Sequence, residues 1–259
     1  MIRLFRKLRH ELAEKQDYRK YTIYAISEVF LVVIGILIAL GLNNWNQDRK
    51  EHQEEIKMLL GLHQQLGTDL IQLRDNIAST EARREKVLKI LELLDDPDNI
   101  DLPEFAILQL DLTEDDYFVS QRAIFDEAVS SGKLNLIQND SLRQSIFQYY
   151  NAISNERDND KLQFKVTNEL IMPIMVQEVA STKEFMDVFS RSKGYNINAN
   201  IPRLDLKALS KSKKYYQAII YAMGDEYQMK DWLKYSTLAK NLIRSIKFEL
   251  EDYNVDVKE

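Results

Sequence analysis

The chain of 259 residues contains no cysteine, only 7 glycines and only 4 prolines. The lack of cysteine excludes disulfides, thiolate metal sites and a cysteine nucleophile. It does not exclude a location outside the cytoplasm, because a domain of this size can bury enough core without disulfides. Glycine and proline build the many turns of β-sandwiches and α/β folds. Their scarcity therefore predicts few, long elements and an all-α fold.

Signatures of catalysis are also missing. The sequence has no P-loop, no dinucleotide-binding G-x-G-x-x-G and no G-x-S-x-G motif. Its 3 histidines are His10, His52 and His63, and no two of them have the spacing of a zinc motif. We expect His52 and His63 to be surface or interface residues. The acidic loop at residues 113–116 lacks the order and the glycine of an EF-hand. We therefore expect no catalysis, no cofactor and no metal.

Charge is divided unevenly along the chain. Of the formal net charge of −6, residues 1–20 contribute +4, from seven Lys/Arg and three acids. Residues 43–259 contribute −9, and Glu28 accounts for the remainder. Phosphate binding rests on cationic side chains, so the acidic main part is a poor match for nucleic acid. We expect no nucleic-acid partner.

The longest apolar stretch directly follows the basic end. Apart from tyrosines, residues 21–42 contain a single ionisable side chain, Glu28. The uninterrupted run Val29–Leu42 is shorter than the roughly 20 residues that cross the hydrocarbon layer of a bilayer. A membrane-spanning helix therefore has to include residues 22–27 and, with them, Glu28. Three aromatic residues near its ends have the positions of interfacial anchors, and these are Tyr21, Tyr24 and Trp45.

The flanking charges give this span a direction. Seven Lys/Arg precede it, and three follow it within about 20 residues. The positive-inside rule predicts that the N-terminus faces the cytoplasm. We expect the lipid bilayer to be a partner of this protein. Two alternatives are a buried core helix of a soluble protein and a cleaved signal peptide with small residues Ala39 and Gly41. The long basic region, the long apolar stretch and the carboxylate within it favour an uncleaved signal anchor.

Residues 1–15 have an amphipathic pattern. Apolar residues recur at spacings of three and four and fall on one helical face, and these are Ile2, Phe5, Leu8 and Leu12. Basic residues on the other faces are predicted to contact lipid head groups, and these are Arg3, Arg6, Lys7 and Arg9. The alternative is a disordered, positively charged tail.

Glu28 is the unusual residue of the predicted span. A charged side chain at the bilayer centre costs about 2–3 kcal/mol on insertion scales, so it usually faces protein or water. At helical spacing Glu28 shares a face with Val32, Gly35 and Ala39, and the last two form a small-xxx-small pair that lets helix backbones approach closely. This membrane-association face (Glu28, Val32, Gly35, Ala39) predicts self-association. Alternatively, Glu28 lies near the cytoplasmic interface and reaches the head groups.

Beyond the span, the hydrophobic pattern predicts helices. A long helix is expected at residues 47–94, continuous or broken near Gly61 or Gly67, followed by a connector rich in helix breakers at residues 95–103. Its predicted core stripe is Ile56, Leu59, Leu60, His63, Leu66, Leu70, Leu73 and Ile77.

Further helices are predicted in the second half of the chain, and the last is expected to pack against the long helix and close an up-and-down bundle. They are expected at residues 104–110, at 119–131 up to Gly132, from Ser141 toward 178 with a kink or break at Pro173, and at 225–253. The inner face of the helix from Ser141 is predicted to be Ile146, Tyr149, Tyr150 and Ile153. The core stripe of the last helix is predicted to be Trp232, Leu233, Tyr235, Leu238, Leu242, Ile246 and Leu250.

Two stretches of the sequence resemble an uncharacterised protein family. They are Lys20–Lys50 (KYTIYAISEVFLVVIGILIALGLNNWNQDRK) and Arg122–Asn151 (RAIFDEAVSSGKLNLIQNDSLRQSIFQYYN). Members of that family are single-pass proteins of Bacteroidetes-type bacteria, grouped only as a domain of unknown function. The resemblance implies the same membrane-anchored helical design, and it supplies no activity and no functional residues.

The sequence thus predicts three parts: a basic amphipathic cytoplasmic segment at residues 1–20, a transmembrane helix at 21–42 and an α-helical extracytoplasmic domain at 43–259. The expected location is the bacterial inner membrane, with the main domain in the periplasm. The expected function is that of a non-enzymatic scaffold or interaction protein, which self-associates or joins an envelope complex. One alternative is a periplasmic ligand-sensing domain that signals through a membrane partner. A closed apolar pocket inside the bundle would favour this alternative. Another is a hydrolase that uses converging carboxylates.

Overall fold

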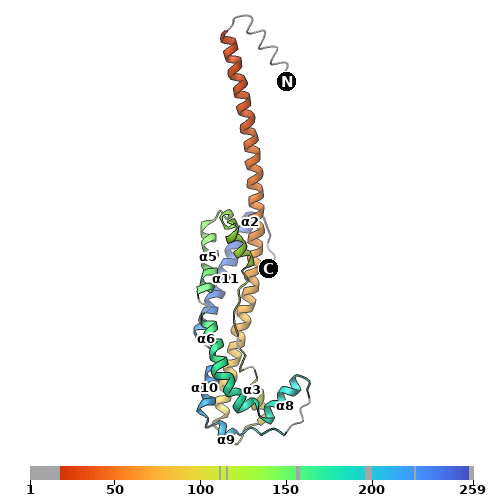
Figure 1. The fold of residues 1–259 in the computed structure, drawn as a ribbon, viewed down its shortest axis with the longest axis vertical. Helices are drawn as coiled ribbons and strands as arrows, with labels where there is room; N and C mark the ends of the chain where they lie inside the picture. The colour runs from red at the N-terminus through yellow and green to blue at the C-terminus, as the bar shows by residue number, and fades with distance from the viewer. Residues whose placement is uncertain are drawn as a thin grey trace. The chain divides into compact units, whose positions relative to one another are not determined.

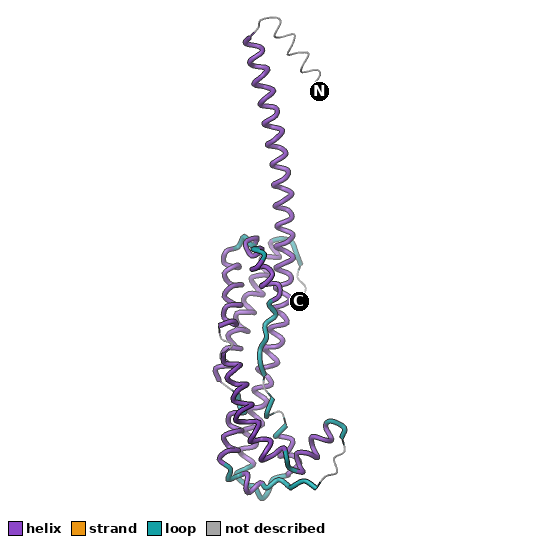
Figure 2. Tube along the Cα trace, viewed as in Figure 1, coloured by secondary structure: helices purple, strands orange, loops and turns teal. Residues whose placement is uncertain are grey.

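The computed structural model describes residues 18–110, 112–114, 116–155, 158–195, 200–224 and 226–256. These residues form helices joined by loops, with no strand among them (Figure 1, Figure 2). The fold is all-α, as the composition predicts. The chain divides into two compact units, Met1–Lys57 and Met58–Glu259. The predicted basic contacts Arg3, Arg6, Lys7 and Arg9 lie outside the described residues.

The first described helix, α2 (Tyr18–Leu93), has 76 residues and is drawn in red to yellow in Figure 1. It contains both the predicted apolar span and the predicted long helix, with no break at Gly61 or Gly67. A Cβ added at Gly67 would meet no atom within 4 Å, whereas one at Gly61 would lie 2.2 Å from Cδ1 of Ile124. Gly61 therefore leaves room for a side chain from a later part of the chain.

The remaining elements are short helices and one further long helix. After α2 come α3 (Leu102–Leu108), α4 (Ala123–Ser130), the 3-10 helix η1 (Lys133–Leu136) and α5 (Asp140–Asn155). These are followed by α6 (Asp158–Val166), η2 (Thr167–Ile171), α7 (Met172–Met175), η3 (Val176–Ala180) and α8 (Lys183–Ser192). The last are α9 (Leu206–Leu209), α10 (Lys213–Tyr221) and α11 (Glu226–Asp252).

Helix ends follow local chemistry. The side chains of Asp101, Asp205 and Ser212 accept hydrogen bonds from backbone N–H groups in the first turns of α3, α9 and α10. Asn139 caps α5 in the same way, through a hydrogen bond of 3.1 Å. Gly132 follows α4 with a φ of +72°. This left-handed conformation suits glycine, so the predicted end of that helix is confirmed.

Pro173 changes the winding of its helix without ending it. It lies at the start of α7, and the two π-helical segments η2 and η3 come directly before and after that short helix. Proline removes one backbone donor and its ring crowds the preceding turn. Wider π turns are one way for a helix to accommodate such a disturbance. The expected kink or break thus takes the form of two local changes in winding.

The core of the second unit is apolar and spans many elements. One cluster joins the C-terminal part of α2 to α3, η2, α7, η3, α9 and α10, and its members include Val87, Ile90, Phe105, Ile171, Tyr215 and Ile219. Helices α5 and α11 pack side by side (Figure 1). The predicted inner face of α5 is confirmed, since all four of its residues are buried.

Other sequence predictions are wrong in detail. Leu60 and Leu233 belong to the predicted apolar stripes, but their exposed fractions are 37% and 51%. Asp69, which has no place in an apolar stripe, is fully buried. Residues 119–122 form a loop instead of a helix, and α4 begins only at Ala123. The burial of Asp69 and the late start of α4 have a common cause, which is the hydrogen bonding of side chains on α2.

Candidate functional site

The apolar segment of α2 (residues 25–42) is the first candidate site. It is part of a helix that is long and apolar enough to cross a membrane, and none of its most apolar window is buried. Every large hydrophobic side chain from Ile26 to Leu42 is exposed. Its backbone groups are paired within the helix, and the Ser27 hydroxyl donates a 2.8 Å hydrogen bond to the Ile23 carbonyl. A surface of this kind suits an apolar solvent, because each polar group already has an internal partner.

The predicted membrane-association face lies within this segment. Val32, Gly35 and Ala39 are exposed, and Glu28 is half-buried. A Cβ added at Gly35 would meet no atom within 4 Å, so the described chain leaves this small-residue surface open. Trp45 is 63% exposed at the end of the segment, where an interfacial anchor is predicted. The side chains of the other two predicted anchors, Tyr21 and Tyr24, lie outside the described residues.

A stripe of polar side chains on α2 forms the second candidate site. This polar stripe consists of Gln65, Asp69, Gln72, Asn76, Thr80 and Arg83, which recur at spacings of three and four and share one face of the helix. An extended segment (residues 116–122) runs along this face, visible in teal in Figure 2. Residues that come later in α2 contact residues that come earlier in the extended segment, so the two run antiparallel.

Side chains of the polar stripe bind the backbone of the extended segment and its flanks. Three of these hydrogen bonds are Asn76 Nδ2 to the Tyr117 carbonyl at 3.0 Å, Val119 N–H to Gln72 Oε1 at 3.3 Å, and Ile124 N–H to Gln65 Oε1 at 3.3 Å. At the far end, Arg83 donates to the Glu114 carbonyl and to the Asp116 carboxylate. Extended chain without a neighbouring strand leaves its N–H and C=O groups unpaired. The polar stripe supplies partners for several of them.

Asp69 is the centre of this arrangement. Its carboxylate accepts hydrogen bonds from the Ser120 hydroxyl at 2.6 Å, the Gln121 N–H at 2.7 Å and the Tyr149 hydroxyl at 2.7 Å. Burial raises the pKa of the Asp69 carboxyl, although these three hydrogen bonds oppose the shift. Burial raises the pKa of Tyr149 as well, and the nearby charge of Asp69 adds to that increase. Tyr149 therefore remains a protonated donor.

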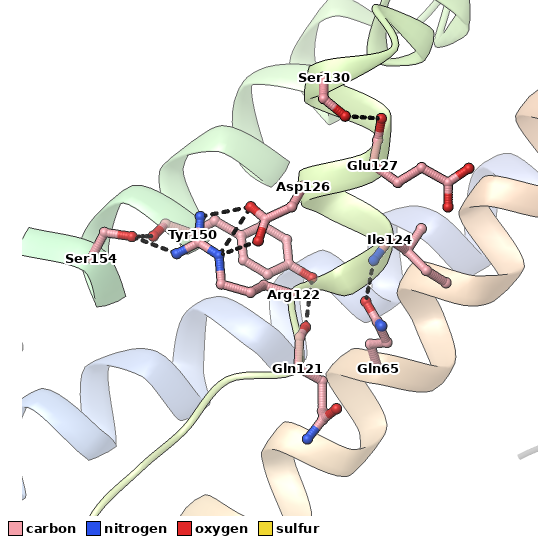
Figure 3. Close-up of polar contacts among 9 residues, drawn as sticks. All are labelled: Gln65, Gln121, Arg122, Ile124, Asp126, Glu127, Ser130, Tyr150 and Ser154. Carbon is pink, nitrogen blue, oxygen red and sulfur yellow. Dashed lines mark hydrogen bonds and ion pairs between the residues drawn. The ribbon is translucent and has the colours of Figure 1, made fainter.

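The junction between the extended segment, α4 and α5 carries a second polar cluster (Figure 3). Arg122 contacts both carboxylate oxygens of Asp126 at 3.0–3.1 Å and donates to the Ser154 hydroxyl at 2.8 Å. Tyr150 stacks on Phe125 with ring centroids 4.1 Å apart. These contacts hold α4 against α5, and all of their residues except Ser154 belong to one of the two stretches that carry the family resemblance.

The polar side chains of Asp69 and Arg122 form hydrogen bonds with other groups of the same chain. Both oxygens of Asp69 accept hydrogen bonds from the fold, and the guanidinium of Arg122 is shared between two side chains. Among the described residues no group of three or more His, Asp and Glu is placed to hold a metal ion. His52 is exposed and His63 is half-buried. The arrangement therefore fixes helices and the extended segment, and it offers no free acid and base pair at Asp69.

Sequence reasoning missed the polar stripe because it followed only apolar periodicity. The signal was present, since six polar residues recur at helical spacing beside the apolar positions of α2. Such a stripe usually indicates a solvated face. Its partner is the extended segment. The hydrogen bonds from this segment to Asp69 and Asn76 join residues that are 41–52 positions apart in the chain. No local pattern predicts that pairing.

Comparison with known proteins places the chain in a family. No curated protein and no solved structure matches it. A family model, however, covers the apolar segment from Glu28 onward, the whole polar stripe, the extended segment and the junction around Arg122. The chain belongs to this family of unknown function (DUF6090), whose model matches residues 28–172, more than half of its length.

Proposed function

We propose that this protein is a non-enzymatic, membrane-anchored interaction protein of the bacterial inner membrane. Its N-terminus faces the cytoplasm, and the helical second unit lies in the periplasm. The observation that carries the proposal is the apolar segment of α2, whose large hydrophobic side chains are all exposed from Ile26 to Leu42. Exposure of so long an apolar surface to water is unfavourable, and a bilayer removes that cost.

Continuity of the helix supports an anchor that is retained. The apolar segment and the polar stripe belong to the same helix, α2, which ends only at Leu93. A core helix of a soluble protein is buried, whereas none of the most apolar window of α2 is buried in the described chain. The basic end ahead of the segment supplies the direction of insertion.

The absence of cysteine allows a direct test of this topology. Two single-cysteine variants, His10→Cys and Lys240→Cys, are labelled in spheroplasts with a maleimide that does not cross membranes. Lys240 is an exposed residue of α11. We expect labelling of Lys240→Cys in intact spheroplasts and of His10→Cys only after lysis. The reverse pattern, or recovery of the full chain in the soluble fraction, contradicts the proposal.

The membrane-association face is the proposed contact between copies. Gly35 and Ala39 leave open space on one side of α2, so the backbone of a second helix can approach there. Glu28 lies on the same side of the helix and faces the partner helix in such a dimer. Packing at small residues, together with a polar contact, is how helices associate within lipid, where burial of apolar surface gives no advantage.

Disulfide cross-linking in native membranes tests this contact. At about 100° per residue, Leu37 lies on the opposite side of the helix from Gly35 and Ala39. The matched variants are therefore Ala39→Cys and Leu37→Cys, both at exposed positions. Mild oxidation is expected to yield a covalent dimer of Ala39→Cys and little of Leu37→Cys. Equal cross-linking of the two variants, or none in either, rules out this face.

A further inference from the structure

A pocket of about 260 Å³ lies between α3 and α8, two helices of the second unit that contact each other (Figure 1). Leu102 and Pro103 of α3 form one wall, and Arg203 contributes from the segment after α8. The wall on α8 recurs at helical spacing, and its residues are Lys183, Glu184, Asp187, Val188 and Arg191. Neither the polar stripe nor the apolar segment contributes to this α3–α8 pocket.

Glu184 fixes one of the two arginines at the pocket. Its side chain is buried, and its two carboxylate oxygens accept hydrogen bonds of 2.8 Å from Arg203 Nε and from the Leu204 N–H. Burial by itself would raise the pKa of Glu184, but the hydrogen bonds from Leu204 and Arg203 lower that pKa below its ordinary value. Glu184 is therefore an ionised carboxylate that holds the guanidinium of Arg203 in place.

The backbone around Arg203 is fixed as well. On one side, the Pro202 carbonyl accepts a 2.8 Å hydrogen bond from the Lys183 N–H. On the other side, the Leu204 N–H binds Glu184. Arg203 thus lies between two contacts to the first turn of α8. A side chain held in this way loses little freedom when a ligand binds, which favours a binding site.

Both arginines have donors that a ligand can use. Arg203 contacts Glu184 through Nε, and its side chain is 74% exposed, so its Nη groups are open to solvent. Arg191 is exposed at the end of α8, and its side chain has no partner in the part of the chain that the structure describes. A molecule in the α3–α8 pocket can therefore reach both guanidinium groups.

The charges that line the pocket leave one cation unbalanced. Three of these side chains are basic and two are acidic. Glu184 pairs with Arg203 at 2.8 Å, and Asp187 pairs with Lys183 at 3.0 Å. Arg191 is left without a counter-charge among the described residues. The pocket therefore suits a ligand that carries a single negative charge.

We propose that the α3–α8 pocket binds a compact monocarboxylate through the guanidinium groups of Arg191 and Arg203. A planar carboxylate matches the fork of N–H donors on arginine, whereas a doubly charged phosphate exceeds the single unbalanced charge. The apolar part of the ligand packs on Leu102, Pro103 and Val188. The volume is just below the range of about 300–1,000 Å³ for ligand sites, so the ligand is small.

The carboxylate belongs to a free acid or to the C-terminus of a peptide, and the chemistry of recognition is the same for both. This site goes beyond the proposed membrane anchor and contact between copies. It is also independent of them, since all of its residues belong to the second unit.

Methyl NMR of the full-length protein tests the proposal, in a non-ionic detergent and in a neutral buffer without carboxylate or phosphate. The reporters are the methyl groups of Val188 in the pocket and of Val129, an exposed residue of α4. The probes are 4-methylpentanoate, its neutral amide 4-methylpentanamide, and acetate, which lacks the apolar part. We expect 4-methylpentanoate to shift the Val188 signals saturably and to leave those of Val129 unchanged. The amide and acetate are expected to bind about tenfold more weakly.

Two variants test the arginines, and a third is the matched control. Arg191→Gln is expected to weaken binding of 4-methylpentanoate about three- to tenfold, and Arg203→Gln at least as much. Arg244→Gln makes the same chemical change at an exposed position of α11 outside the pocket, so it is expected to leave the affinity unchanged. Arg191→Gln alters an exposed side chain without a described partner, so it keeps the test decisive even when Arg203→Gln loosens the segment after α8.

A peptide probe separates the two sources of the carboxylate. Tighter binding of N-acetylglycylglycylvaline than of 4-methylpentanoate supports the pocket and assigns it to peptide C-termini, and weaker binding assigns it to free acids. The proposal is overturned by any of four results. These are equal binding of 4-methylpentanoate and its amide, equal binding of 4-methylpentanoate and acetate, equal shifts of Val188 and Val129, and equal losses of affinity in Arg191→Gln and Arg244→Gln.

Discussion

The Tyr149 hydroxyl donates a 2.7 Å hydrogen bond to Asp69, although the two residues lie 80 positions apart in the chain. The same carboxylate accepts hydrogen bonds from Ser120 and Gln121 in the extended segment. One buried acid thus connects α2, the extended segment and α5. Apolar contacts tolerate sliding of one element along another, whereas these directional bonds fix the register.

Replacement of Asp69 by alanine is expected to lower the free energy of unfolding substantially. It leaves the Ser120 hydroxyl, the Gln121 N–H and the Tyr149 hydroxyl without their acceptor, at about 1–3 kcal/mol for each donor that finds no other partner. Asp69→Asn keeps one acceptor oxygen and is expected to cost less. Denaturant unfolding of the full chain in detergent, followed by circular dichroism, measures both.

Asp75→Ala is the matched control for these two variants. Asp75 lies on the same helix but is exposed and pairs only with its neighbour Arg74 among the described contacts. Its loss is expected to change the free energy of unfolding by no more than about 0.5 kcal/mol. A similar loss of stability in Asp69→Ala and Asp75→Ala refutes the central role of Asp69.

The raised pKa of Asp69 predicts a particular pH dependence. The folded state holds the Asp69 proton at pH values where the unfolded chain, near its ordinary pKa of 3.8, has released it. The contribution of Asp69 to stability therefore falls as pH rises from about 4 to the raised pKa and is constant above it. Relative to Asp69→Asn, wild-type protein is expected to lose stability across this range. Unfolding curves of both proteins from about pH 4 to about pH 7 measure the difference. A wild-type advantage that grows with pH contradicts the sign.

The parts of the fold that follow local rules could be predicted from the sequence. The left-handed Gly132 follows the end of α4, where the sequence predicts it, and Asn139 caps α5 just before the predicted start of that helix. The buried face of α5 also follows from apolar spacing alone. In each case the determining groups lie within one or two helical turns of each other, so a linear pattern contains the information.

The parts that depend on distant partners could not be predicted. The sequence predicts a helix at residues 119–122, but Val119 and Gln121 donate backbone N–H groups to Gln72 and Asp69 on α2, and the Ser120 hydroxyl also donates to Asp69. That same pairing buries Asp69, while Leu60 is left exposed. The membrane-association face, by contrast, follows from helical spacing alone and stays a prediction.

The two glycines within the second-unit part of α2 are expected to respond differently to alanine. Gly67→Ala adds a methyl group in open space, so it is expected to stabilise the helix by about 1 kcal/mol. Gly61→Ala gains the same helix propensity but meets Cδ1 of Ile124 and is expected to stabilise less or to destabilise. Melting temperatures in detergent measure both.

A second change isolates the steric cause at Gly61. Ile124→Val removes the Cδ1 atom that a Cβ at Gly61 would meet. In that background Gly61→Ala is expected to recover most of the gain seen for Gly67→Ala, because neighbouring substitutions of this kind are not additive. Additive effects of Gly61→Ala and Ile124→Val contradict the proposed contact.

His63 on α2 is affected by the charge of Lys247 on α11. Burial lowers the pKa of its imidazole below 6.5, and the charge of Lys247 lowers it further. The unfolded chain therefore binds a proton more readily, so the stability contributed by neutral His63 is lost as pH falls below about 6.5. Lys247→Gln is expected to raise the His63 pKa without restoring 6.5, because burial is the larger cause. NMR titration of the imidazole, assigned with His63→Gln, measures the shift. The exposed Lys240 on the same helix is the control, and an equal response to Lys240→Gln excludes a specific effect of Lys247.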